Sequence, residues 1–155
     1  MTVRSLDHVL VLADDIEATR EFYCQAVGLT VGDRPPLEFP GYWLYTGAGG
    51  AGDTRGSGGA GGPGACLHIA ERGAYAAHAS RLGLRVPERD PGVGPVDHVA
   101  FRAGDYRGVV ERLERCGVAA VTNAVPGGPR QVFIEDPNGV RVEISVLDVA
   151  AEVPD

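Results

Sequence analysis

The sequence lacks the features that mark several large protein classes. No stretch approaches the roughly 18 consecutive apolar residues that a membrane-spanning helix requires, and no run of basic residues offers a surface for phosphates. The net charge of −7 at pH 7 also opposes nucleic-acid binding. Neither G-x-G-x-x-G opening a helix nor G-K-[ST] occurs, so no phosphate-binding loop is predicted. We therefore expect neither a nucleic-acid nor a membrane partner.

Cysteine is scarce, and a secretory leader pattern is not evident. The three cysteines, Cys24, Cys66 and Cys116, are far apart and in no C-x-x-C spacing, which is typical of reduced thiols rather than disulfides. A strand-like pattern begins within the first few residues, where a signal peptide would show its apolar core. Both observations predict a cytoplasmic protein.

The chain does contain one pattern twice. Leu6-Asp7-His8-Val9 opens the first copy and Val96-Asp97-His98-Val99 opens the second. The match continues downstream until a slip of one residue pairs Gly28 with Gly117. A tandem duplication explains this pattern. Closing the two copies about a pseudo-twofold axis would bring their histidines together.

Each copy predicts the element order βαβββ and therefore an α+β fold. The segment Asp14-Asp15-Ile16-Glu17 resembles a capping box and predicts a helix that ends near Val27, with Gly28 as its stop. Asp105 and Gly117 are the expected cap and stop of the second helix. The predicted strands are 5–12, 29–32, 41–46 and 65–70 in the first copy, and 96–102, 118–123, 130–135 and 140–147 in the second.

The predicted organisation has four parts. A first module (1–70) contains ten glycines between Gly47 and Gly64, which predict a mobile loop. A linker (71–95) contains a short helix from Ala74 to Leu82 and is followed by the second module (96–147) and a C-terminal tail (148–155). Asp136-Pro137-Asn138-Gly139 predicts a hairpin between the last two strands.

Four residues of metal-ligating types occupy repeat-equivalent strand positions: His8, His68, His98 and Glu143. Strand alternation puts the apolar neighbours of His68 and Glu143 on the opposite face, so we expect these side chains to line a concavity. A carboxylate in the middle of a strand needs a partner to offset its desolvation, and a divalent metal is such a partner. Imidazole and carboxylate without thiolate suit Zn, Ni, Co, Mn or Fe. His78 lies in the predicted linker helix without a partner residue and is expected at the surface.

Three motifs resemble the vicinal oxygen chelate superfamily: L-D-H-V at a strand start, a second D-H-V-A-F, and D-P-N-G-x-x-x-E-I near the end. That superfamily includes glyoxalase I, methylmalonyl-CoA epimerase, extradiol dioxygenases, fosfomycin-resistance enzymes and bleomycin-binding proteins. The resemblance covers about residues 5–147 and implies a cupped, barrel-like mixed sheet with helices outside. It also implies one divalent metal ion on His8, His68, His98 and Glu143, chelated by two adjacent oxygens of the substrate.

The resemblance implies three alternative functions. The first is a glyoxalase-like lyase or isomerase, in which Glu143 leaves the metal to act as the base. Glyoxalases have Glu and the epimerase has Gln where this chain has His68, so His68 is either a ligand or a second acid/base. The second function is an Fe(II) extradiol dioxygenase with His8, His98 and Glu143 as its facial triad. The third is a metal-free antibiotic-binding protein.

The expected partner is a small-molecule substrate, and the residues expected to shape its pocket are Phe101, Gln131, Phe133 and Trp43. The resemblance also implies a homodimer, in which modules pair within or between chains. The sequence identifies neither the substrate nor the metal. Reactions that share this repeat and these ligands have in common only that the substrate chelates the metal.

Overall fold

The computed structural model consists of two compact units. The first unit is Met1–Cys24 with Gly28–Arg89, and the second is Gln25–Val27 with Asp90–Asp155. The predictions for the Gly-rich loop and the C-terminal tail lie outside the described residues, which are 8–46, 65–84, 86, 96–126 and 128–146. No helix within these ranges is long and apolar enough to cross a membrane.

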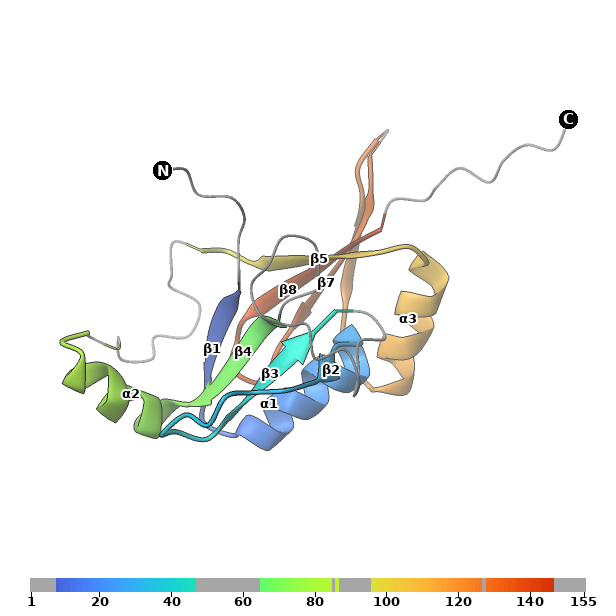
Figure 1. Cartoon of the computed structure of the whole chain (residues 1–155). Helices are drawn as coiled ribbons and strands as arrows, with labels where there is room; N and C mark the ends of the chain where they lie inside the picture. The colour runs from blue at the N-terminus through green and yellow to red at the C-terminus, as the bar shows by residue number, and fades with distance from the viewer. Residues whose placement is uncertain (1–7, 47–64, 85, 87–95, 127, 147–155) are drawn as a thin grey trace, which may run out of the picture. The chain divides into compact units, whose positions relative to one another are not determined.

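The first unit contains a four-stranded mixed sheet in the order β1-β4-β3-β2 (Figure 1). Strands β1 and β4 are parallel, whereas β3 is antiparallel to both β4 and β2. Its elements are β1 (Val9–Ala13), α1 (Ile16–Phe22), the π-helical turn η1 (Tyr23–Val27), β2 (Thr30–Val31), β3 (Gly41–Tyr45), β4 (Ala65–Glu71) and α2 (Arg72–Arg81). The predicted strand over 29–32 is therefore reduced to two residues.

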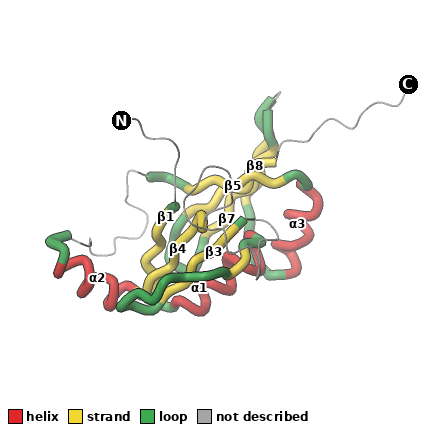
Figure 2. The backbone as a smooth tube through the Cα atoms, viewed as in Figure 1, coloured by secondary structure: helices red, strands yellow, loops and turns green. Residues whose placement is uncertain are grey.

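The second unit repeats this plan, with its sheet in the order β5-β8-β7-β6 (Figure 2). Strands β5 and β8 are parallel, and β7 is antiparallel to both of its neighbours. Its elements are β5 (Val99–Ala103), α3 (Tyr106–Arg115), β6 (Val121–Ala124), β7 (Arg130–Glu135) and β8 (Arg141–Val146). The prediction of an α+β fold with two βαβββ repeats is confirmed.

Each sheet buries one face, as strand alternation predicts. In β4, Leu67 and Ile69 are almost fully buried, and α1 packs against β4 and β3. In the second sheet, Val132, Val142 and Val146 are fully buried. Since alternate residues of a strand point to opposite faces, the residues between them, including His68 and Glu143, share the other face.

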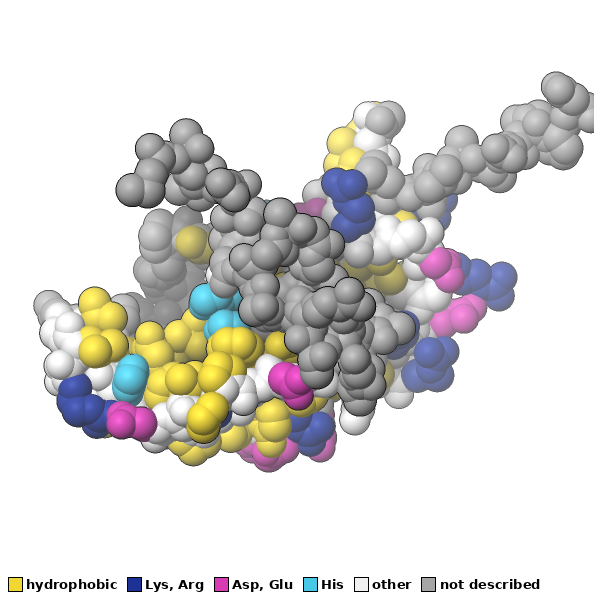
Figure 3. All heavy atoms as spheres, viewed as in Figure 1, with side chains coloured by type: hydrophobic (Ala, Val, Ile, Leu, Met, Phe, Trp, Pro, Cys, Tyr) yellow, Lys and Arg dark blue, Asp and Glu magenta, His cyan; other side chains and the backbone are white. Residues whose placement is uncertain are grey.

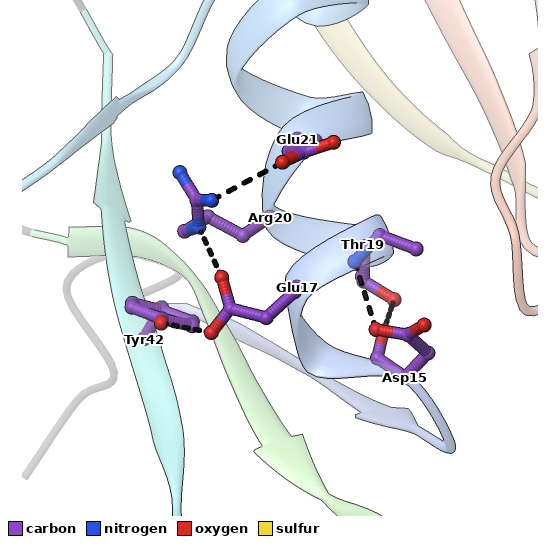
Figure 4. A network of polar contacts seen from close by, with 7 residues as sticks. Asp15, Glu17, Thr19, Arg20, Glu21 and Tyr42 are labelled. Atoms are coloured by element: carbon purple, nitrogen blue, oxygen red, sulfur yellow. Dashed lines mark hydrogen bonds and ion pairs between the residues drawn. The ribbon is translucent and has the colours of Figure 1, made fainter.

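The beginning of α1 differs from the predicted capping box. Asp15 is the N-cap, and its carboxylate accepts a hydrogen bond from the backbone N–H of Ala18. Glu17 does not reach back to the cap, so that part of the prediction is wrong. Instead, Glu17 pairs with Arg20 at 2.9 Å and accepts a hydrogen bond from the hydroxyl of Tyr42 in β3 (Figure 4). These contacts connect α1 to the sheet.

This network makes stability depend on pH. The hydrogen bond from Tyr42, with help from Arg20, holds the pKa of Glu17 below its ordinary value of 4.5. A lowered folded-state pKa adds stability above the unfolded-state pKa, and this stability is lost as the pH falls through the folded-state pKa. We expect Tyr42→Phe to lower the urea midpoint at pH 7 and to have a smaller effect at about pH 3.5. An equal loss at both pH values would contradict a role for the ionised carboxylate.

The one-residue slip in the repeat has a structural counterpart in η1. The backbone N–H of Gly28 donates to the carbonyl of Tyr23, five residues back, at 3.0 Å. This bond closes a π-helical turn, which holds one residue more than an α-helical turn. Gly28 and Gly117 have φ angles of 92° and 66°, the left-handed conformation of glycine helix stops. Both predicted helix stops are confirmed, and the extra residue of the first copy lies in η1, before Gly28.

The linker helix begins earlier than predicted. Helix α2 starts at Arg72, and the side chain of Glu71 caps it by accepting hydrogen bonds from two backbone N–H groups. His78 on this helix is half-buried, which corrects the prediction of a surface position. Its ring lies 5.1 Å from that of Phe39, and its Nδ1 lies 3.7 Å from a Glu38 carboxylate oxygen.

The hairpin between β7 and β8 forms at the predicted Asp-Pro-Asn-Gly segment. The buried carboxylate of Asp136 accepts hydrogen bonds from the backbone N–H groups of Asn138 and Val140, each at 2.8 Å. Gly139 adopts a φ of 80°, which a residue with a side chain disfavours. The turn fixes the pairing of Phe133 with Glu143 on the two strands.

Candidate functional site

In the first unit, the two predicted histidines stack on each other. The rings of His8, directly before β1, and His68, in β4, have centroids 3.8 Å apart and planes inclined by 18°. Trp43 of β3 lies in register with His68 and stacks on it at 4.2 Å and 3°. The result is an aromatic stack of three rings on the open face of this sheet. Figure 3 shows histidine side chains beside hydrophobic ones on the surface of this unit.

The stack determines how these histidines can bind an ion. The lone pair of a neutral imidazole nitrogen lies in the plane of its ring, so the lone pairs of two face-to-face rings do not converge on one point. Trp43 holds His68 from one side, whereas His8 is exposed and lies just outside β1. Binding of one ion by both rings therefore requires His8 to turn out of the stack.

In the second unit, the predicted histidine and carboxylate face each other. His98, directly before β5, places its Nε2 3.1 Å from Oε2 of Glu143 in β8. Glu143 is only 6% exposed, and Phe133 of β7 meets the His98 ring edge-on at 5.9 Å. Two donors that each lie about 2.1 Å from one ion are separated by roughly 3.0–3.4 Å. The pair is thus spaced as two ligands of one metal ion would be.

Asp97 sets which nitrogen of His98 faces the carboxylate. The Asp97 Oδ1 lies 2.8 Å from the His98 Nδ1, and its Oδ2 pairs with Arg141 at 2.6 Å. The contacts with His98 and with Arg141 hold the pKa of Asp97 below its ordinary value, so Asp97 is a carboxylate that can accept a hydrogen bond from the Nδ1–H of His98. Metal-ligating histidines usually donate their second nitrogen in this way. This arrangement leaves Nε2 as the ligating atom.

The other oxygen of Glu143 accepts a hydrogen bond from one amide side chain, which is in turn held by a second. Gln131 of β7 donates from Nε2 to Glu143 Oε1 at 3.0 Å, and Asn123 of β6 donates from Nδ2 to Gln131 Oε1 at 2.8 Å. We refer to Asn123 and Gln131 as the amide pair. Gln131 was expected to line a substrate pocket, whereas its side chain contacts the candidate ligand itself. Sequence analysis missed Asn123, and cross-strand pairing with Gln131 would have been the only signal.

Of the four residues expected to shape a pocket, three share a face with a candidate ligand. Trp43 lies beside His68, and Phe133 and Gln131 lie beside His98 and Glu143. Phe101 is the exception, because it lies in register with Ile144 on the face opposite Glu143. Its odd separation from His98 along the chain explains this placement.

Each unit therefore carries one pair of candidate donors. Among the described residues, no group of three or more His, Cys, Asp or Glu side chains is placed to hold an ion. The donor chemistry, imidazole from both units and carboxylate from one, fits a borderline divalent metal. Two βαβββ units that carry such donors on one face of each sheet define a class of duplicated-module proteins.

The chain belongs to the Glyoxalase/Bleomycin resistance protein/Dioxygenase superfamily, whose family model matches residues 5–144. This match confirms the resemblance inferred from the three sequence motifs. Among curated proteins, the chain is similar to Glyoxylase I 4 of Arabidopsis thaliana, with 28% identity over 158 residues that cover 97% of this chain and 75% of the relative.

Solved structures share the fold at lower identity. Lactoylglutathione lyase from Agrobacterium tumefaciens has a TM-score of 0.58 and 19% identity, over 94% of this chain and 96% of that one. TnmS3, an antibiotic-binding protein from Streptomyces sp. CB03234, has a TM-score of 0.54 and 20% identity, over 94% of this chain and 98% of that one. The fold is therefore shared by an enzyme and by a binding protein.

Proposed function

We propose that this protein is a divalent-metal-dependent lyase or isomerase of the glyoxalase type. Its substrate is a small molecule that chelates the metal through adjacent oxygens. His98 and Glu143 of the second unit and His8 and His68 of the first are the proposed ligands of one ion. The similarity to Glyoxylase I 4 over nearly the whole chain supports this class of reaction.

The spacing of His98 and Glu143 is the observation that carries the proposal. A buried carboxylate is costly unless it is paired, and here its partner is a histidine already oriented by Asp97. The Nε2 and Oε2 atoms, 3.1 Å apart, are positioned to share an ion without rearrangement of the second sheet. For His8 to ligate the same ion, its ring has to turn out of the stack on His68.

The residues then have distinct tasks. A bound divalent ion supplies Lewis-acid polarisation of the chelating oxygens, which acidifies the neighbouring carbon. Glu143 is the proposed base: its Oε2, when not ligating the ion, would take a proton from that carbon, while Gln131 donates a hydrogen bond to Oε1. In the alternative assignment, His8, His98 and Glu143 hold the ion, and His68, held in its stack by Trp43, is the second acid/base that gives a proton to the substrate. Water then takes the proton from Glu143 and supplies one to His68.

One observation favours a second candidate, a metal-free antibiotic-binding protein. The aromatic stack of Trp43, His68 and His8 resembles a surface for planar ligands, and the fold is similar to that of the antibiotic-binding protein TnmS3. Such a protein would use the same sheet face without an ion. The two candidates therefore differ in whether the purified protein carries metal.

Elemental analysis of protein purified without chelators tests the proposal, with His98→Ala as the matched variant. We expect about one equivalent of divalent metal per site in the wild type and its loss in the variant. Zn, Ni or Co would favour proton transfer, whereas Fe would favour an extradiol-type dioxygenase. If the wild type contains no metal and takes none up on titration, both enzyme functions are wrong and the binding protein is the better account.

A further inference from the structure

We infer that the amide pair, Asn123 and Gln131, positions Glu143 and sets the affinity of the second unit for its metal. Both are positioning residues, since neither lies among the proposed ligands. The inference rests on the proposed function in that Glu143 is taken as a ligand. It goes further by assigning a role to a surface residue on an edge strand, Asn123 of β6.

The contacts form one directed series of hydrogen bonds across three strands. Asn123 and Gln131 lie directly opposite each other on β6 and β7, and Gln131 and Glu143 come from adjacent strands β7 and β8. The Asn123 Nδ2 donates to the Gln131 Oε1 at 2.8 Å, and the Gln131 Nε2 donates to the Glu143 Oε1 at 3.0 Å.

Asn123 thereby helps to hold the Gln131 amide with its nitrogen toward Glu143. A glutamine amide can present either its oxygen or its nitrogen to a neighbour, and the two ends have nearly the same shape. A donor at position 123 attracts the Gln131 oxygen and leaves the nitrogen for the carboxylate. An acceptor at position 123 attracts the nitrogen instead and turns the oxygen toward Glu143.

The orientation matters because Glu143 is almost completely buried. With the amide nitrogen toward it, Oε1 is satisfied and Oε2 faces His98. With the amide oxygen toward it, Oε1 loses its donor and meets a second acceptor, which costs more in a buried site than at the surface. The carboxylate would then be displaced from its position beside His98.

The test compares Asn123→Asp with Asn123→Ala. Aspartate can only accept, so Asn123→Asp is expected to reverse Gln131 and weaken binding of Zn²⁺ or Co²⁺ about 10- to 100-fold, as measured by chelator competition. Alanine leaves Gln131 able to donate to Glu143, so we expect a change below about threefold. Gln131→Ala should weaken binding about as much as Asn123→Asp.

The sign of the effect separates positioning from charge. An added carboxylate near a cation site strengthens cation binding through simple Coulomb attraction, whereas reversal of the amide weakens it. If Asn123→Asp binds the metal as tightly as the wild type or more tightly, the inference is wrong. The Co²⁺ absorption spectrum provides a second measure, and it should change in Asn123→Asp and not in Asn123→Ala.

A metal-independent measurement keeps the inference testable if the wild type binds no ion. In ¹H–¹⁵N spectra, one side-chain amide proton of Gln131 should be shifted downfield and exchange slowly, because it is bonded to a buried carboxylate. Glu143→Ala and Asn123→Asp should remove this shift, and Asn123→Ala should retain it. If the protein binds no metal but shows these shifts, the proposed function is wrong and the positioning of Glu143 by the amide pair still holds. Loss of the contrast between the two Asn123 variants would contradict the inference.

Discussion

His98→Ala is expected to abolish the quenching of Trp43 fluorescence by Ni²⁺, although the two residues belong to different units. Trp43 is the single tryptophan of the chain and stacks on His68 at 4.2 Å. An ion with a partly filled d shell, bound at His68, would quench this fluorescence. If the same ion also needs His98 and Glu143, removing His98 should weaken its binding at least about 100-fold.

The control for this experiment is His78→Ala, which removes the one histidine that is not a proposed ligand. We expect this variant to show the quenching curve of the wild type. Titration of chelator-treated protein with Ni²⁺, followed by tryptophan emission, gives the apparent affinity of each variant. Unchanged quenching in His98→Ala would mean that the first unit binds the ion alone, and the four-residue site would be wrong.

Gly41→Ala is expected to destabilise the first unit by about 3 kcal/mol, the upper part of the range for overpacking. A Cβ at this position would lie far inside van der Waals distance of the backbone carbonyl oxygen of Ile69 and close to the backbone of Ala70. Backbone atoms cannot move aside as a flexible side chain can, so β3 would have to separate from β4. Since Trp43 follows two residues later, its stack on His68 would be disturbed as well.

Gly104→Ala is the matched control, because a Cβ at that position meets no atom within 4 Å. We expect its unfolding free energy to stay within about 0.5 kcal/mol of the wild type. Urea unfolding followed by circular dichroism gives both values, and near-ultraviolet dichroism reports the environment of Trp43. A Gly41→Ala protein as stable as the Gly104→Ala control would show that the close approach of β3 and β4 is not required.

Local sequence patterns predicted most of the elements, because each has a short-range cause. Alternation along β4 and β8 predicted that Leu67 and Val142 would be buried on the face opposite His68 and Glu143. The glycine stops were predictable because the left-handed conformation strongly favours glycine. The capping-box pattern, by contrast, puts the cap at Asp14, three residues before Glu17, whereas Asp15 occupies the position.

The parts of the candidate site that were missed depend on pairing between strands. Phe101 lies close to His98 in sequence, yet alternation over an odd separation puts it on the other face. Asn123 sits on an exposed edge strand without apolar periodicity, so only its register with Gln131 reveals its role. The stack of His8 on His68 likewise depends on the parallel pairing of β1 with β4.

The π-helical turn η1, which follows α1, records a change in length after the duplication. Two copies produced by duplication begin with equal length, so a residue present in only one of them entered or left after the duplication. The turn at Tyr23–Val27 absorbs this difference, since Gly28 still ends the helix as Gly117 does in the other copy. The two halves were thus free to diverge in length while their strands stayed in the same order. Relatives whose first helix has no π-helical turn would represent the other branch of this history.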